Sequence, residues 1–98
     1  MRRGTTPTLK IDVDTDLTTA TVMYLTLEQN DETVIEKTLS DLTVTENSVS
    51  CTLTQEDTLA LNYLKPLDMQ IRARIGGTAL ASNIMRTLVG RILKDGVI

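Results

Sequence analysis

Three aspartates at alternate positions are the residues whose type and spacing most resemble a chemical site. Asp12, Asp14 and Asp16 match the carboxylate positions that open a calcium-binding loop. However, Leu17 stands where that loop needs glycine, and Met23 stands where it needs a bidentate glutamate. Alternate carboxylates of a strand lie about 7 Å apart, superficially a glycosidase separation, but these would point from one exposed face with no pocket. We therefore interpret the three aspartates as a solvated acidic strand end.

The chain lacks the residue types on which most other protein chemistry depends. It contains no histidine and only one cysteine, so histidine-dependent catalysis and the common zinc sites have no basis in the sequence. Cys51 alternates with Val49 and Leu53, and this spacing predicts a small buried strand residue. Gly76-Gly77 is a turn signal and not a phosphate-binding loop. We expect no enzyme activity, no cofactor and no metal ion.

The composition is typical of one β-rich domain. Threonine accounts for 17 of the 98 residues, and its β-branched side chain favours strands. The net charge of −3 argues against a nucleic-acid partner. No apolar run approaches the roughly 20 residues of a transmembrane helix, so we expect no membrane partner. Arg2 and Arg3 are followed by polar residues, which predicts no Sec signal and synthesis in the cytoplasm.

Alternation between apolar and polar residues recurs along the chain, with turn signals between the runs. Asn30-Asp31 and Gly76-Gly77 predict two-residue hairpin turns, and Thr54 to Asp57 matches a capping box that begins a short helical turn near 55–60. We predict strands near 8–13, 21–29, 32–39, 42–44, 48–54, 67–75 and 79–92. About seven short strands predict an all-β fold, an immunoglobulin-like antiparallel β-sandwich. We expect a flexible arm over residues 1–7 and a single sandwich domain over residues 8–98.

The last predicted strand has two possible registers. If it is regular after the Gly76-Gly77 turn, Ile84 and Leu88 face the core. Met85 and Val89 then lie on an exposed apolar stripe, which is a candidate partner interface. A bulge near residues 82–83 reverses the faces and buries Met85 and Val89 instead. The sequence leaves both registers open.

The two chain ends are the other candidate interfaces. Apolar residues near the carboxyl end favour packing onto a partner or adding a strand to it, and the alternative is that this segment closes the domain's own sheet. The amino-terminal arginines are a second candidate for docking. The interface residues that we predict at the two ends are Arg2, Arg3, Arg91, Ile92, Leu93, Val97 and Ile98.

Two further arginines lie on the polar face of a predicted strand. Arg72 and Arg74 follow Asp68 at alternate positions. We interpret them as part of a cross-strand charge ladder.

Four segments together resemble a known family: Met1–Thr8, Leu53–Leu59, Ala79–Ile84 and Val89–Ile98. They resemble small prophage proteins of Gram-positive gut bacteria that are usually encoded among tail genes. The strand pattern is also loosely similar to the immunoglobulin-like amino-terminal domain of siphophage baseplate upper proteins, which in addition carry a long fibre or receptor-binding region. The resemblance implies a non-enzymatic tail or baseplate module with a connector or decoration role. Its partners would be tail or baseplate subunits or a second copy of itself, and it would be found in the virion.

Two other classes of function remain open from the sequence. One is a carbohydrate- or cell-surface-binding β-module, although the chain has no tryptophan or phenylalanine to stack on sugar rings. The other is a binder or inhibitor of a host protein, since an acidic chain with exposed strand edges suits a basic partner.

Overall fold

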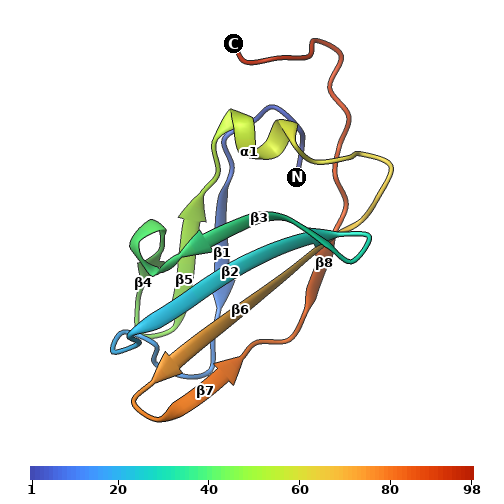
Figure 1. The fold of residues 1–98 in the computed structure, drawn as a ribbon. Helices are drawn as coiled ribbons and strands as arrows, with labels where there is room; N and C mark the ends of the chain where they lie inside the picture. Colours follow the sequence, from blue (N-terminus) through green and yellow to red (C-terminus); the bar gives the residue numbers. More distant parts are fainter.

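The computed structural model describes all 98 residues, which form two antiparallel β-sheets facing each other across one core (Figure 1). The structure confirms the predicted all-β sandwich with one short helical turn, although the chain forms eight strands rather than about seven. The elements are β1 (Thr8–Asp12), β2 (Val22–Gln29), β3 (Glu32–Thr38), the 3-10 turn η1 (Leu39–Asp41), β4 (Thr43–Val44), β5 (Ser48–Thr52), α1 (Gln55–Leu59), β6 (Leu67–Ile75), β7 (Thr78–Ala81) and β8 (Met85–Thr87). None of the helices is long or apolar enough to cross a membrane.

The two sheets differ in size and completeness. The smaller sheet has the order β1-β5-β4, and the larger has the order β3-β2-β6-β7, with β8 pairing with the same strand, β6, as β7 does. Alternation along each strand sends one set of side chains inward. The core contains the aliphatic residues that this pattern predicts, with Leu27, Leu53 and Leu67 fully buried.

Both predicted two-residue hairpins are present. Asn30 and Asp31 have φ values of 54° and 64°, which places both in the left-handed region that this kind of turn requires. They connect β2 to β3, and Gly76-Gly77 connects β6 to β7 with Ile75 opposite Thr78. Local turn chemistry therefore sets the register of the β6–β7 hairpin and of the β2–β3 pairs next to the turn, but a bulge between Leu27 and Glu28 shifts the rest of the β2–β3 register by one residue.

A register shift between β7 and β8 decides which face the last strands present. Arg72 lies opposite Ala81, whereas Met69 lies opposite Met85, so one extra residue is inserted on the β7–β8 side. An insertion of one residue exchanges the two faces of a strand. Of the two registers left open by the sequence, the bulged register is therefore the one in the structure.

The bulge corrects the predicted apolar stripe. Val89 is buried in the core and Met85 is half-buried against it. Ile84 and Leu88, which the regular register would bury, are 65% and 77% exposed. The sequence predicted that the last strand ends near residue 92, but regular strand structure ends at Thr87.

The amino-terminal segment differs from the flexible arm that the sequence predicts. The backbone N–H of Arg3 donates to the carbonyl of Gly90, and the N–H of Gly90 donates to the carbonyl of Met1. The carbonyl of Pro7 accepts from the N–H of Leu53. Residues 1–7 are thus hydrogen-bonded to two distant parts of the chain.

The helical turn α1 begins as its capping sequence predicts. The Thr54 hydroxyl accepts from the N–H of Asp57, and the Asp57 carboxylate accepts from the N–H of Thr54. The same carboxylate lies 2.9 Å from the Nζ of Lys37 on β3, which ties this turn to the larger sheet.

Candidate functional site

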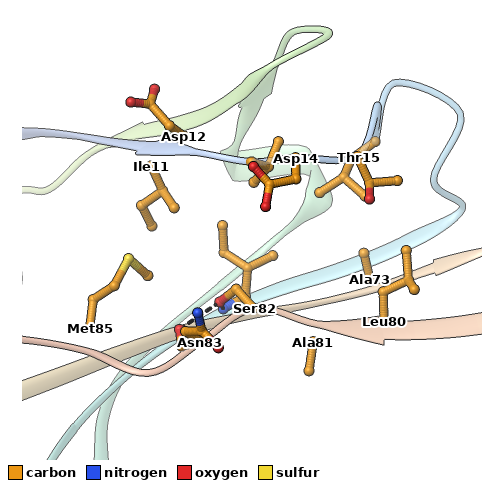
Figure 2. A pocket seen from close by; sticks show the side chains of 13 residues that line it. Ile11, Asp12, Asp14, Thr15, Ala73, Leu80, Ala81, Ser82, Asn83 and Met85 are labelled. Carbon is orange, nitrogen blue, oxygen red and sulfur yellow. Dashed lines mark hydrogen bonds between the residues drawn. The ribbon is translucent and has the colours of Figure 1, made fainter.

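An open cleft lies between the two sheets on the side where β1 faces β7 and β8. Its volume is about 390 Å³, which falls within the roughly 300–1,000 Å³ of ligand-binding clefts. Figure 2 shows Ile11 of β1 and Met85 of β8 pointing toward each other at one part of the cleft, while Ala73 and Leu80 line another. The full lining is Ile11, Asp12, Val13, Asp14, Thr15, Leu17, Ile71, Ala73, Leu80, Ala81, Ser82, Asn83 and Met85.

The cleft is open because two edge strands border it without pairing to each other. β1 pairs only with β5, and β7 pairs only with β6. The N–H of Val13 and the carbonyl of Pro7 are bonded toward β5, so the backbone groups of Lys10 and Asp12 point to the free edge. On the other border, the N–H of Ser82 is bonded to the carbonyl of Ile71 on β6. By the same alternation, the backbone N–H and C=O groups of Ala79 and Ala81 point away from β6, to the free edge of β7.

Side-chain hydrogen bonds hold the bulge that forms one wall of the cleft. The Ser82 hydroxyl accepts from the N–H of Ile71 at 3.0 Å and donates to the carbonyl of Asn83 at 3.0 Å. The carbonyl of Ser82 accepts from the side-chain amide of Gln70 at 2.9 Å. Ser82 therefore replaces the sheet hydrogen bonds that the inserted residue interrupts.

The three aspartates that the sequence singled out lie at the β1 side of this cleft or beside it. Asp12 and Asp14 are both lining residues, but Figure 2 shows the carboxylate of Asp14 directed toward the cleft and that of Asp12 directed away from it; Asp16 follows in the next loop. The hydroxyl and the backbone N–H of Thr18 both donate to Asp16 and hold the pKa of its carboxyl below the usual value. No group of three or more aspartate, glutamate, cysteine or histidine side chains is arranged to hold a metal ion. None of the three aspartates forms an ion pair.

The sequence prediction missed the cleft itself. It placed the aspartates on an exposed face without a pocket, and it treated the inward aliphatic residues of β1 and β7 as ordinary core. The possible bulge near residues 82–83 was the only hint in the sequence that this side is incomplete. Which strand edges remain unpaired follows from the sheet order, and this depends on contacts between distant segments.

The carboxyl-terminal segment, residues 88–98, is the second feature of interest. Leu93 and Ile98 are each 89% exposed and Val97 is 58% exposed. The backbone of Ile98 exchanges two hydrogen bonds with the side chain of Gln55, at 2.9 and 3.1 Å. Within this segment, residues 93–98 are thus held by the hydrogen bonds between Ile98 and Gln55 and by the ion pair between Asp95 and Arg3, while three large aliphatic side chains face solvent.

Ile92 is the predicted interface residue of this segment that packs against its own chain. It is half-buried, and its Cδ1 would lie 2.8 Å from a Cβ added at Gly4, which has a φ of +70°. Only glycine accommodates both this backbone conformation and the closeness of Ile92. Ile92 is thus part of the domain, whereas Leu93, Val97 and Ile98 are free to contact a partner.

The three arginines predicted at the chain ends have different roles. Arg3 donates to the carbonyls of Leu61 and Leu59 at 2.8 and 2.9 Å, and its ion pair with Asp95 is 3.5 Å long. Arg2 donates to the carbonyl of Arg91 at 2.6 Å. Arg3 is therefore committed to the fold, a correction to its predicted role in docking, while Arg2 and Arg91 remain exposed.

The predicted charge ladder is also corrected. Arg72 lies between Tyr24 and Ala81, and Arg74 lies between Val22 and Ala79, so neither has a charged cross-strand neighbour. Instead, Asp68 forms a two-pronged ion pair with Arg86 of β8, with distances of 2.7 and 3.0 Å. The hydrogen bonds from this guanidinium hold the pKa of Asp68 below its usual value.

Cys51 occupies the buried strand position that its spacing predicts. Its side chain lies in the core, and burial raises the pKa of the thiol. A thiol that is both inaccessible and protonated is a poor nucleophile.

Comparison with protein-family models, curated proteins and solved structures gave no match. The resemblance to prophage tail-region proteins therefore stays an expectation from the sequence, and the arguments below depend on the cleft and on the carboxyl-terminal segment.

Proposed function

We propose that this protein is a non-enzymatic binding module that acts by assembly, docking its carboxyl-terminal segment onto a protein partner. The resemblance of its sequence to prophage tail-region proteins leads us to propose a tail or baseplate of a phage or prophage as the place of assembly. The observation that carries the docking role is the exposure of Leu93, Val97 and Ile98 at a chain end. In a monomer these side chains would remain in water.

The energetic argument is direct. Full burial of one aliphatic side chain of this size stabilises an association by roughly 1.5–3 kcal/mol. Three such side chains on one short segment would offset part of the loss of translational and rotational freedom on binding. Residues 93–98 are attached to their own chain by two hydrogen bonds between Gln55 and Ile98 and by the 3.5 Å Arg3–Asp95 ion pair, whose aspartate is exposed. Ion pairs of exposed groups contribute about 0–1 kcal/mol. These last six residues can therefore leave their own chain and bind a partner at a small cost in free energy, while residues 88–92 stay anchored to the domain.

The test compares the full chain with a variant that lacks Lys94–Ile98. Light scattering coupled to size-exclusion chromatography should give a mass above the 10.8 kDa of one chain for the full protein and a lower mass for the deletion variant. A circular dichroism spectrum rich in β-structure for both would show that the fold is retained. Equal masses with an intact fold would rule out the docking role.

A substitution series controls for the general effect of removing apolar surface. The triple variant Leu93→Ser, Val97→Thr, Ile98→Thr should lose association as the deletion does. Val22→Thr is the matched control, because Val22 is 41% exposed on the outer face of β2, away from the chain end. The place of assembly is tested separately by the neighbouring genes, since a setting without tail, tape-measure or lysis genes would contradict it.

A further inference from the structure

We infer that the cleft between β1 and β7 receives the carboxyl-terminal segment of a second copy of this chain. This inference rests on the proposed docking role of that segment and names its partner. Three observations carry it: the form of the cleft, the charge of its rim, and the positions of cleft and segment in the molecule.

The form of the cleft suits an extended chain segment. Its inner wall is aliphatic, with Ile11, Ile71 and Leu80 among the lining residues. Its two borders are the free edges of β1 and β7, whose outward backbone groups have no partner strand. An added strand satisfies such groups and places alternate side chains inward. An extended segment can therefore bind both the polar borders and the apolar interior.

The charges of the two surfaces are complementary. Asp14 directs its carboxylate toward the cleft, and Asp12 lies on the outer side of the β1 border (Figure 2); neither makes an ion pair within the chain. The carboxyl-terminal segment carries Arg91 and Lys94, which are exposed and also make no ion pair. The acidic residue of the segment, Asp95, is paired with Arg3 of its own chain, so Arg91 and Lys94 are the unpaired charges that lie beside the exposed aliphatic side chains. Those are the two properties that the acidic apolar cleft would select.

The positions of cleft and segment make the partner a second copy. The chain ends lie beside α1, whereas β7 and its turn lie at the far end of a molecule whose longest dimension is 46 Å (Figure 1). After Met85 at the cleft, the chain runs away through β8 toward α1, and Ile98 is bonded to Gln55 of α1. The segment of one copy is therefore presented outward, at the opposite end from its own cleft. Contact between unlike surfaces of identical chains is head-to-tail, and it builds rings or filaments.

The decisive experiment mixes two variants that are each defective on one surface. The double variant Asp12→Lys, Asp14→Lys keeps the segment but reverses the charge of the cleft. The deletion of Lys94–Ile98 keeps the cleft but removes most of the segment. Light scattering should find each variant alone to be monomeric. Their equimolar mixture should form a 1:1 dimer, because one intact segment meets one intact cleft and no further copy can be added.

Two controls separate a specific contact from a general charge effect. Glu32→Lys, Glu36→Lys makes the same change of charge at exposed positions of β3, away from the cleft, and should leave association unchanged. Combining Arg91→Glu and Lys94→Glu with Asp12→Lys and Asp14→Lys in one chain should restore at least part of the association that the cleft reversal abolishes.

The outcomes distinguish this inference from the proposed function. If the deletion lowers the mass but the cleft reversal does not, the cleft inference is overturned and the docking role stands, with a different surface of the second copy as the acceptor. If the mixture of the two variants remains monomeric, the inference is likewise overturned. If the deletion leaves the mass unchanged, the docking role fails and the inference fails with it.

Discussion

The α1 end of the molecule and the side between β1 and β7 differ in how their segments are connected. At the end that carries α1, hydrogen bonds connect the amino-terminal residues 1–7 with α1 and the residues that follow it. Along the side between β1 and β7, two strand edges have no partner and face solvent. The Thr58 hydroxyl donates to the carbonyl of Thr5, and Arg3 donates to the carbonyl of the last residue of α1 and to that of Leu61 just after it. No such cross-connection closes the side that contains the cleft. The α1 end therefore provides a rigid body, and the open side provides a surface on which a partner can add stabilising contacts.

Side-chain truncation should give the largest difference between the two regions. Leu53→Ala should cost about 2–5 kcal/mol, since Leu53 is fully buried near the α1 end and its removal leaves a cavity. Leu80→Ala should cost about 1 kcal/mol or less, because Leu80 already borders the open cleft. Urea unfolding measures both values. Equal losses would show that the cleft is packed as tightly as the core.

Replacing each of the two amino-terminal arginines should give the next largest difference in the free energy of unfolding. Arg3→Ala should destabilise the fold by about 2 kcal/mol, because it leaves the carbonyls of Leu59 and Leu61 without their charged donor. Arg2→Ala should cost about 0.5–1 kcal/mol, since Arg2 is exposed and donates one hydrogen bond. The shift in the urea midpoint at constant slope checks this, and a larger effect for Arg2 would contradict the assignment of Arg3 as the fold-anchoring residue.

Substitution of Gly4 and Gly76, which both have positive φ, separates the cost of backbone strain from the cost of overpacking. Gly76→Ala should cost about 1 kcal/mol from strain alone, because nothing lies within 4 Å of the added Cβ. Gly4→Ala should cost about 1–2 kcal/mol, since the same strain is joined by a contact of 2.8 Å with Ile92. Thermal unfolding of both variants measures the difference. If Gly4→Ala were the milder change, Ile92 would not be packed on the amino-terminal segment.

The pair between Lys37 and Asp57 predicts a moderate dependence of stability on pH. Burial raises the pKa of Asp57, but the N–H of Thr54 and the ammonium of Lys37 outweigh it, so the pKa lies below the usual 3.8. The hydrogen bond to Asp57 is the main cause that holds the pKa of Lys37 above 10.5, against desolvation. The stability that the charge of Asp57 contributes is complete above pH 3.8 and is lost as the pH falls through the pKa of Asp57 in the folded protein. The stability that the charge of Lys37 contributes is complete below pH 10.5 and is lost as the pH rises through the pKa of Lys37 in the folded protein.

Asp57→Asn tests this window. The variant should be less stable than the wild type by about 1 kcal/mol near neutral pH, because the ion pair is lost while an amide oxygen can still cap α1. The difference should shrink below about pH 4 and above about pH 10.5. Urea unfolding across this range measures it, and a difference that does not vary with pH would mean that the charge of Asp57 contributes nothing.

Much of the fold could be predicted because its signals are local. Asn30-Asp31 and Gly76-Gly77 accept positive φ, and Thr54 and Asp57 satisfy each other's backbone within one turn, so a few adjacent residues decide these structures. The candidate site was predictable only in part. Leu93, Val97 and Ile98 were identified because apolar residues near a chain end favour packing onto a partner or adding a strand to it. The cleft that we propose as their acceptor was not identified.

By itself, the sequence determined the two-sheet β architecture, the position of Cys51 in the core and the absence of histidine chemistry, because side-chain period and residue type are properties of neighbouring positions. Only the tertiary structure decided that a bulge near Ser82 shifts the register so that Val89 is buried. It also decided that Arg3 donates to carbonyls 56 and 58 residues away, and that the outer edges of β1 and β7 have no partner strand. Each of these depends on which distant segments come together. That choice is made by the free energy of the whole packed chain, and no single stretch of residues carries it.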